Sequence, residues 1–434
     1  MKILEGKSYD VLVCGAGCAG FCAAVQAARA GMRTALVERY GMPGGIMTVL
    51  GNQDVAQFNA HGKMVIEGIG WAFLKELEAQ GYAEIPDMSV KGLPHPLYGV
   101  RVNIVAAAKL MDDYFQREGI DLYYNQPVVS VEVEEETDGV RITGVLIASK
   151  QGIRRLKGTV AVDCTGDGDV CAWAGAPYEC GGESETDLQP GTLRYYLDGS
   201  PSQEGLAALS AGVERALREG WLLPEDFAGH SLGNVLEARG DNINHISGFN
   251  AADSDSKTAA EIRGRQSVLR MLEAFRRSGA GVTIAGCAPE VAPRESRRIL
   301  CDGYITGEDY VSARRYADAI CYSFYPIDRH RSGANGIYQV LLEEGRVPTI
   351  PLSALQPRGL VNAYVAGRCA SGDRLANSAY RVKASCMAMG QAAGAAAAVA
   401  VQENGGRARG CRLEHIKQIL LENGAIVPRD SLDQ

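Results

Sequence analysis

Five side chains in the second half of the sequence have types that could carry out chemistry on a small polar molecule. His245 and His330 can take up or release a proton near neutral pH, because an unperturbed imidazole titrates in that range. Arg294, Arg298 and Arg381 can bind a carboxylate or a row of hydroxyls, because the guanidinium donors form a planar fork. All five lie among apolar or small residues. They are therefore the candidate catalytic and substrate-binding residues.

The arginine-rich segment 292–299 allows a second interpretation. It alternates like a strand, so Arg294, Ser296 and Arg298 are expected on one face. Glu295 lies between them, and an internal salt-bridge network of Arg294, Glu295 and Arg298 is the alternative to a binding role. The remaining four histidines are expected to be structural, namely His61, His95, His230 and His415.

The first forty residues predict the element that must position a cofactor. Residues 9–14 have the pattern of a buried strand and run into a Gly-rich turn, helix 21–29 and a second strand, 34–37, that ends at an acid. In such a βαβ unit the glycines allow a pyrophosphate to approach the helix N-terminus. The acidic side chain accepts hydrogen bonds from the ribose hydroxyls. The sequence therefore predicts an adenine dinucleotide site formed by Gly15, Gly17, Cys18, Ala19, Gly20, Glu38 and Arg39.

A second Gly-rich loop, which contains Gly44 and Gly45, comes directly after this unit. Such a loop suits a long, extended cofactor, because glycine leaves space where side chains would collide. With this loop the sequence resembles the FAD-dependent oxidoreductases related to the fumarate reductase and succinate dehydrogenase flavoproteins. The resemblance implies FAD as the cofactor.

Two later segments extend the resemblance over nearly the whole chain, most closely to a narrower bacterial family of FAD-dependent oxidoreductases. Strands 159–163 and 363–366 each run into a turn, and a small-residue helix opens at 383–391. In the family the N-terminus of that helix points at the flavin pyrimidine ring, where it stabilises the negative charge of reduced flavin. Many relatives carry an acid for the ribitol where this chain has Arg368. The resemblance implies further cofactor contacts at Thr165, Gly166, Asp167, Gly367, Arg368, Ser385, Cys386 and Met387.

The predicted fold class is α/β, with a three-layer, Rossmann-like FAD-binding domain and an inserted α+β substrate or lid domain. The FAD-binding domain is expected at 1–176 and 350–434 and contains an inserted β-meander of strands 128–133, 140–149 and 153–163. The lid is expected at 177–349. Amphipathic patterns predict helices at 63–80, 103–118 and 259–278, the last with Ile262, Val268, Leu269, Leu272 and Phe275 inward.

Composition narrows the function further. The net charge of −8 and the lack of a basic cluster argue against nucleic acid as a partner. The longest apolar run near the C-terminus, 392–401, is too short for a membrane span, and the N-terminus does not resemble a signal peptide. We therefore expect a cytoplasmic protein without a membrane partner. The 12 cysteines contain no C-x-x-C pair, and we expect Cys14, Cys18 and Cys22 to pack in the core rather than bind metal.

These features predict an FAD-dependent oxidoreductase that transfers a hydride between flavin N5 and a small hydroxylated or carboxylated substrate. A fumarate-reductase-like ene-reductase, in which an arginine delivers the proton, is the alternative. A flavin-binding assembly or tRNA-modification partner is a third interpretation. No second nucleotide fingerprint follows, so an external electron carrier or direct reaction with a nicotinamide remains open, as does homo-oligomerisation. No histidine lies between Glu38 and Asn59, which predicts non-covalent FAD.

Overall fold

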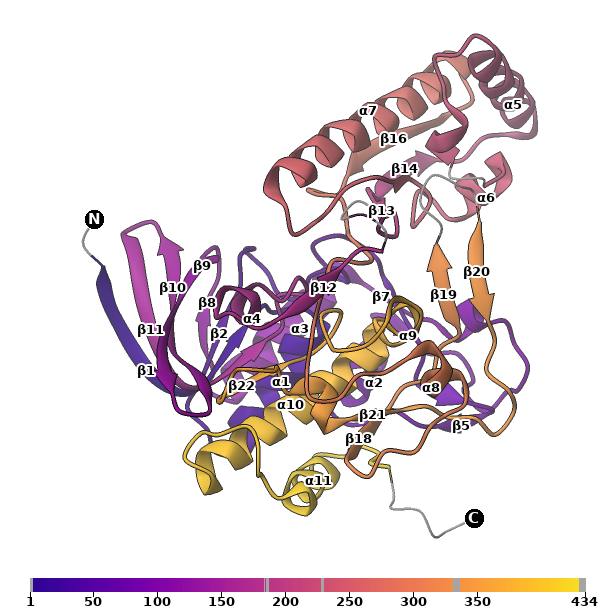
Figure 1. Cartoon of the computed structure of the whole chain (residues 1–434). Helices are drawn as coiled ribbons and strands as arrows, with labels where there is room; N and C mark the ends of the chain where they lie inside the picture. The colour runs from indigo at the N-terminus through magenta and orange to yellow at the C-terminus, as the bar shows by residue number, and fades with distance from the viewer. Residues whose placement is uncertain (1–2, 183, 185–186, 228–229, 331–335, 429–434) are drawn as a thin grey trace.

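The computed structural model describes residues 3–428 except 183, 185, 186, 228, 229 and 331–335. Its main body is built on a parallel sheet in the order β8-β2-β1-β11-β22. These strands are β1 (Leu4–Cys14), β2 (Thr34–Val37), β8 (Asp121–Tyr123), β11 (Gly152–Asp163) and β22 (Ala363–Val365). The sheet brings together strands from the two ends of the chain (Figure 1).

Successive side chains of the central strands enter different layers. On β1, Val11 and Val13 belong to the core on one face of the sheet, whereas Leu12 and Cys14 belong to the core on the other face. This alternation is a direct result of the two-residue period of a strand. Because both faces are covered, the strand is apolar throughout.

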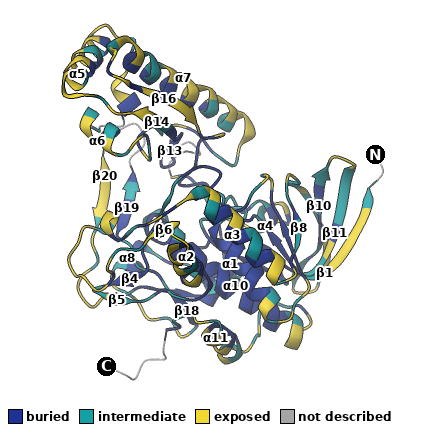
Figure 2. Cartoon of the chain, turned by 180° about the vertical axis from the view of Figure 1, so that it is seen from behind, coloured by how far each residue is buried: buried dark blue, intermediate teal, exposed yellow. Residues whose placement is uncertain are grey.

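Four helices cover the first face: α1 (Cys18–Arg29), α2 (Ile69–Ala79), α3 (Ile104–Arg117) and α10 (Lys383–Glu403). α1 and α10 cross closely, because a Cβ atom at Gly390 would lie only 2.0 Å from the carbonyl oxygen of Ala19. Figure 2 shows both helices as the most deeply buried of the molecule. Among the described residues α10 alone is long and apolar enough to span a membrane, and 89% of its most apolar window is buried inside the protein.

The second face is covered by the meander, in which β10 (Gly139–Ser149) pairs antiparallel with β9 (Val128–Glu136) on one side and with the first half of β11 on the other. Ile142, Val145 and Ile147 of β10 are buried in the core of this face. Helices, sheet and meander form the three layers, and the predicted α/β fold class is confirmed.

A smaller lobe stands on the main body (Figure 1). It consists of β13 (Gly191–Thr192), β14 (Tyr195–Gly199), α5 (Gln203–Arg218), α6 (Leu232–Glu237), β15 (His245–Ile246), α7 (Ser254–Ser278) and β16 (Val282–Cys287). Its separate core runs from Leu193 to Val291. The segment 297–351 instead packs into the main body, where Ile305, Tyr310 and Ile350 are buried. The observed core of the lobe is thus shorter than the 177–349 segment predicted as a domain, whose limits stay a prediction.

Several short elements complete the main body. They are β3 (Asp54–Val55), β4 (Asn59–Ala60), β5 (Lys63–Met64), β6 (Ala83–Glu84), β7 (Val100–Val102), α4 (Asp169–Trp173), β12 (Tyr178–Cys180), β17 (Arg297–Ile299), α8 (Gly307–Val311), β18 (Ala319–Tyr322), β19 (Ile327–His330), β20 (Ile337–Val340), β21 (Thr349–Pro351), α9 (Arg374–Tyr380) and α11 (Leu413–Glu422).

Two details of the predicted helices are wrong. The pattern over 63–80 begins in β5, and helix α2 starts only at Ile69, after Gly68 in a positive-φ conformation. On α7, Val268 and Phe275 are buried as predicted, but Ile262 and Leu269 are exposed. The lobe is thin, so α7 packs on one side only and a narrower stripe of it is covered.

Candidate active site

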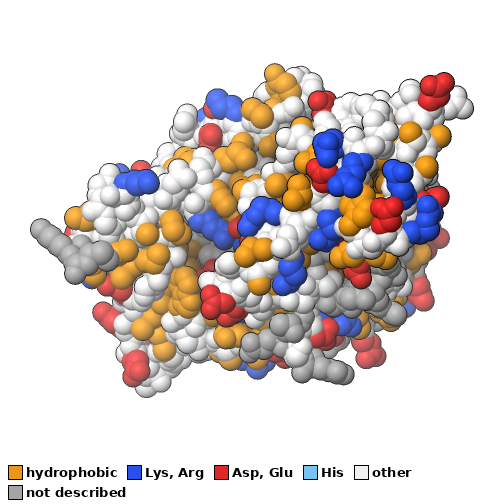
Figure 3. All heavy atoms as spheres, turned by 90° about the horizontal axis from the view of Figure 1, so that it is seen from above, with side chains coloured by type: hydrophobic (Ala, Val, Ile, Leu, Met, Phe, Trp, Pro, Cys, Tyr) orange, Lys and Arg blue, Asp and Glu red, His pale blue; other side chains and the backbone are white. Residues whose placement is uncertain are grey.

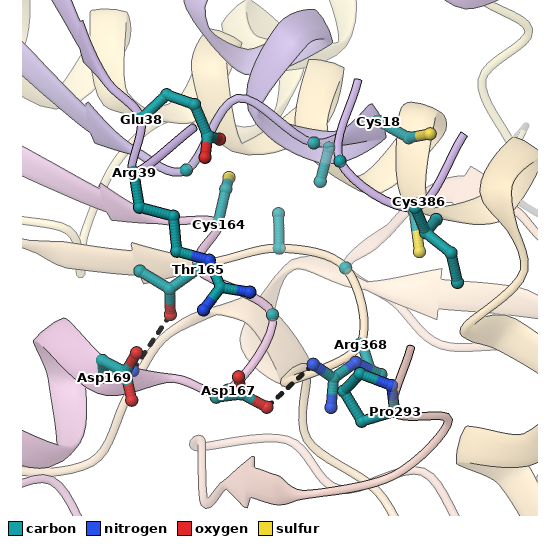
Figure 4. Close-up of a pocket in the computed structure, with 18 of the residues that line it drawn as sticks. Cys18, Glu38, Arg39, Cys164, Thr165, Asp167, Asp169, Pro293, Arg368 and Cys386 are labelled. Atoms are coloured by element: carbon teal, nitrogen blue, oxygen red, sulfur yellow. Dashed lines mark hydrogen bonds and ion pairs between the residues drawn. The ribbon is translucent and has the colours of Figure 1, made fainter. Parts of the chain in front are cut away.

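A cavity opens at the carboxyl ends of β1, β2, β11 and β22, between the main body and the segment that leaves the lobe (Figure 4). Ligands of open parallel sheets bind at this edge, because the turns there present free backbone groups. Most of the predicted cofactor contacts line it: Gly15, Gly17, Cys18, Ala19, Glu38, Arg39, Gly45, Thr165, Gly166, Asp167, Gly367, Arg368 and Cys386.

Gly20 and Gly44 shape the turns behind the cavity rather than its surface. A Cβ atom at Gly20 would lie 1.7 Å from the carbonyl oxygen of Gly15, so only glycine lets α1 start here. Gly44 has φ +102° and donates its N–H to the carbonyl oxygen of Ala16 (2.7 Å), which joins the two Gly-rich loops.

Ser385 and Met387 point into the core and do not line the cavity. The Ser385 hydroxyl lies 2.8 Å from that of Ser323, and Met387 packs against Gly70 of α2. Both residues are in the first turns of α10, where the helix presents only one side to the cavity. Their predicted contact with the cofactor would have to come from the backbone.

The residues around α1 fit the adenosine and pyrophosphate parts of a dinucleotide. Gly17 precedes the first turn of α1 and lines the cavity, and a Cβ atom built there would contact nothing within 4 Å in the described chain. The buried carboxylate of Glu38 accepts from the backbone N–H groups of Ala16 (2.7 Å) and Tyr40 (2.9 Å). Burial raises the pKa of Glu38. The carboxylate is thus held at the end of β2, where it can still accept from ribose hydroxyls.

Asp167 and Arg368 form an ion pair on the opposite wall, at 2.8 Å (Figure 4). The hydroxyl of Ser296 lies 2.5 Å from both side chains, so the pair is fixed in place. Many relatives carry an acidic residue at the position of Arg368. Here Asp167, from the turn that follows β11, supplies a carboxylate to the same wall. The positive charge of Arg368 lowers the pKa of Asp167, although burial opposes this.

Comparison with known families agrees with this geometry. The family described as FAD dependent oxidoreductase matches residues 10–419, which is nearly the whole chain. The chain belongs to this family. It is therefore an FAD-dependent oxidoreductase, and the cavity with its Gly-rich turns is the candidate FAD site.

Several solved structures are similar to this chain at low sequence identity. A geranylgeranyl bacteriochlorophyll reductase-like protein from Thermoplasma acidophilum is 12% identical, with 96% of this chain and 84% of that chain covered and a TM-score of 0.41. OxyS anhydrotetracycline hydroxylase from Streptomyces rimosus is 14% identical, with 96% and 66% covered and a TM-score of 0.44. A flavocytochrome c3 fumarate reductase is 14% identical, with 91% and 78% covered and a TM-score of 0.40. No curated protein sequence matches this chain.

The flavin end of the FAD site follows from the direction of the cofactor. Glu38 marks the ribose and Gly17 the pyrophosphate, so an extended FAD places its flavin beyond Gly17. The residues that line this part of the cavity include Gly45, Ile46, Leu50, Pro293, Arg294, Arg381, Lys383 and Cys386. Two of the five predicted catalytic residues, Arg294 and Arg381, are among them.

Arg294 is a buried cation with neutral partners. Its guanidinium donates to the carbonyl oxygen of Pro190, to Oδ1 of Asn242 and to Nε2 of His245 (3.0 Å). Among the described residues no carboxylate lies within ion-pair distance of it. Burial, followed by the positive charge of Arg381, lowers the pKa of Arg294 to about 9.

His245 holds Arg294 and does not line the cavity. Its Nε2 atom accepts a hydrogen bond from Arg294 at 3.0 Å. Burial and the adjacent charge of Arg294 lower the pKa of His245 to about 2. A ring that is neutral at pH 7 and accepts a hydrogen bond from Arg294 is suited to hold Arg294 in position rather than to deliver a proton.

His330 and Arg381 approach the same place from the main body. The rings of His330 and His245 meet edge to face, with centroids 5.1 Å apart, and Nε2 of His330 lies 3.6 Å from Asp328. Burial lowers the pKa of His330 to about 4. Arg381 donates to Gln189 and to the backbone oxygen of Asp328, both at 3.2 Å, and its Nε has no partner among the described residues.

Arg298 does not belong to the cavity. It donates to Glu295 (3.0 Å), Glu179 (3.3 Å) and the carbonyl oxygen of Gly372 (3.1 Å), an internal network of the kind that the sequence left open. Only residues 297–299 of the strand expected at 292–299 form a strand, β17. Arg294 lies before this strand, so the prediction that Arg294 and Arg298 share one strand face is wrong. The bends before β17 turn Arg294 toward the lobe instead.

The sequence analysis did not single out several residues that line this cavity, among them Lys383 and Trp173. Lys383 is the first residue of α10, and its ammonium reaches the flavin end. Trp173, at the end of α4, is 45% exposed and lines the adenosine end. A lysine at the start of a helix that opens toward the flavin was the available signal for the first. Nothing in the local pattern marks Trp173, because the cavity wall only forms when α4 packs beside the meander.

The cysteines near the cofactor turn are packed as expected. Cys14, Cys18 and Cys22 are buried free thiols, and burial raises the pKa of each. Within the described part of the chain no group of three His, Cys, Asp or Glu residues is arranged to hold a metal ion.

Proposed function

We propose that this flavoenzyme transfers a hydride between flavin N5 and a small organic substrate that carries a carboxylate. The observation that supports this is the pair Arg294 and Arg381, two cations that line the flavin end of the cavity without an acidic partner among the described residues. An uncompensated charge in a sheltered site is costly unless a ligand neutralises it.

Arginines elsewhere in the same region have such a partner. Arg374 pairs with Glu295 at 2.7 Å, Arg297 with Asp169 at 2.7 Å, and Arg368 with Asp167 at 2.8 Å. By contrast, Arg381, whose Nε atom has no partner among the described residues, and Arg294 can each donate a charge-assisted hydrogen bond to a substrate carboxylate.

Each residue of the site has a separate role in this proposal. Arg294 and Arg381 bind and orient the carboxylate, and His245 and Asn242 hold Arg294 in position. The flavin accepts or gives the hydride. For the oxidation of a hydroxyl-bearing substrate, neutral His330 would accept the hydroxyl proton, and Asp328 beside it would stabilise the imidazolium that results. His330 is buried next to the cavity and is not among its lining residues, so the substrate would have to reach past Arg294 and Arg381. The electrons then leave to a separate acceptor, a small molecule or a redox protein.

A second candidate is reduction of a carbon–carbon double bond conjugated to the carboxylate. It is favoured by the lowered pKa of Arg294, about 9, because a guanidinium with that pKa gives up a proton more readily than a solvated one. His245 is not a proton donor at pH 7 because its pKa is about 2. In this direction the hydride goes to the substrate, and Arg294 would supply the proton.

Anaerobic mixing tests both candidates. The holoprotein is mixed with 2-hydroxy acids and with their amides, and the photoreduced holoprotein with enoates and enamides, while flavin absorbance is followed. Bleaching by a hydroxy acid supports the first candidate, and recovery of absorbance with an enoate supports the second. Equal rates with the uncharged amides would contradict the carboxylate anchor in both.

A further inference from the structure

We infer that Lys383 is a cofactor-positioning and potential-tuning residue, whose ammonium charge stabilises the reduced flavin. This inference rests on FAD as the cofactor and not on the proposed substrate. Lys383 lines the flavin end of the cavity, together with Cys386 one turn further along the same helix.

The ammonium is fixed by uncharged oxygens. Nζ donates to Oδ1 of Asn52 at 2.6 Å and to the backbone oxygen of Asp54 at 2.7 Å. Among the described residues no carboxylate lies within ion-pair distance of it. The ammonium is therefore held in place by uncharged acceptors. Burial lowers the pKa of Lys383, and the nearby carboxylates of Asp241 and Asp54 oppose this.

Lys383 differs from the two cavity arginines in what holds it. Arg294 is held by Asn242 and His245, which belong to the lobe. Lys383 is held only by the main body, through α10 and the loop that follows the second Gly-rich turn. The charge thus stays with the cofactor wall, whatever the lobe does when a substrate enters.

The dipole of α10 acts in the same direction. Lys383 is the first residue of a 21-residue helix that begins after Val382, without a side-chain cap among the described residues. The N-terminus of a helix carries about half a positive charge, and reduced flavin carries its negative charge on the pyrimidine side. Helix and ammonium together favour the reduced, anionic form, so the midpoint potential should depend on Lys383.

Measurement of the midpoint potential in the Lys383→Met and Lys383→Arg holoproteins tests the inference. Loss of the charge should weaken the reduced form relative to the oxidised form by about tenfold, which is about 30 mV for a two-electron couple. Sulfite, which adds to flavin N5 and leaves negative charge on the ring, should bind K383M about tenfold more weakly. K383R, which keeps the charge, should return both values toward those of the wild type.

Lys257→Met is the matched control. Lys257 is also a sheltered lysine, but it donates to Glu290 at 3.0 Å and so already has an acidic partner. Its removal should leave the potential unchanged. If K383M binds FAD and keeps the wild-type potential and sulfite affinity, the inference is overturned. If K383M does not retain FAD, the same measurements on K383R and K383Q decide: equal potentials in these two variants would equally overturn it.

Discussion

At the scale of residues, the flavin end of the site is distinguished by charges that the protein leaves unbalanced. Arg294, Arg381 and Lys383 are held by amide, imidazole and carbonyl acceptors, whereas Arg368 and Arg374 have carboxylates. The sheltered histidines beside Arg294 are neutral because of burial and of that positive charge. Asp328 is the nearby carboxylate whose charge acts on both Arg294 and Arg381, but it is not within ion-pair distance of either among the described residues.

The lowered pKa of His330 predicts a pH dependence of stability. An unfolded histidine takes up a proton below about pH 6.5, but folded His330 does so only near pH 4. Between these two pH values the unfolded state binds more protons than the folded state. The free energy of unfolding therefore falls as the pH falls, by about 1.4 kcal/mol per pH unit for each such histidine. Thermal unfolding of the holoprotein between pH 7 and pH 5 should show a smaller loss in His330→Asn. A loss equal to that of the wild type would contradict the assigned environment.

The site residues could be predicted from the sequence only in part, for a physical reason. The glycines and Glu38 act through local backbone geometry, which a spacing of few residues already determines. Arg294 and Arg298 are equivalent by pattern, yet one lines the cavity and the other is in an ion-pair network with Glu295. That difference depends on which acids other segments bring close, and the local sequence does not contain it.

At the scale of elements, the approach of α1 and α10 sets the shape of the cofactor site. The two helices meet at small residues, with Gly390 against the backbone of Ala19 and Gly394 against that of Ala23. The existence of α1 was predicted from the βαβ fingerprint, and that of α10 from the small residues at 383–391 and the family resemblance. Helix ends were predicted less well, since α2 begins where Gly68 packs against Gln391, a contact between distant segments.

Gly390→Ala should therefore impair FAD binding. The added Cβ atom would lie 2.0 Å from the carbonyl oxygen of Ala19, so α1 must move away, at a cost of about 1–3 kcal/mol for overpacking. Gly212→Ala on α5 is the control, because its nearest neighbour would be at 3.6 Å and alanine favours a helix by about 1 kcal/mol. The FAD content and melting temperature of G390A should fall while those of G212A hold or rise. Equal behaviour of the two variants would refute the tight crossing.

At the scale of the whole molecule, a lobe with its own core closes over a cofactor domain that is assembled from both ends of the chain. In Figure 3, which looks down on the lobe, basic and acidic side chains are interspersed. Ion pairs such as Arg276–Glu273 and Arg265–Glu261 on α7 account for part of this. The lid was predicted as an insertion, but its limits differ from the observed core because 297–351 returns to the main body.

Non-covalent FAD is a prediction for the intact protein. His61 is the first histidine after the Gly-rich loops. It packs against Phe324, with ring centroids 5.0 Å apart, and is not among the residues that line the cavity. Acid precipitation of the yellow holoprotein should leave FAD in the supernatant. Flavin that stays in the pellet and maps to a histidine or a cysteine peptide would show a covalent link instead.

The central claim, a carboxylate anchored by Arg294 and Arg381 beside the flavin, is tested most directly by flavin difference spectra. The holoprotein is titrated with small carboxylates and with their amides, in the wild type, Arg294→Met, Arg381→Met and the control Arg263→Met, an exposed arginine of α7. A carboxylate should perturb the wild-type flavin spectrum in a saturable way, and each cavity variant should weaken that binding by about 10- to 100-fold, as expected for a charged hydrogen bond. Arg263→Met should bind as the wild type does. Amides that bind as tightly as the acids, or cavity variants with wild-type affinity for the acids, would contradict the account.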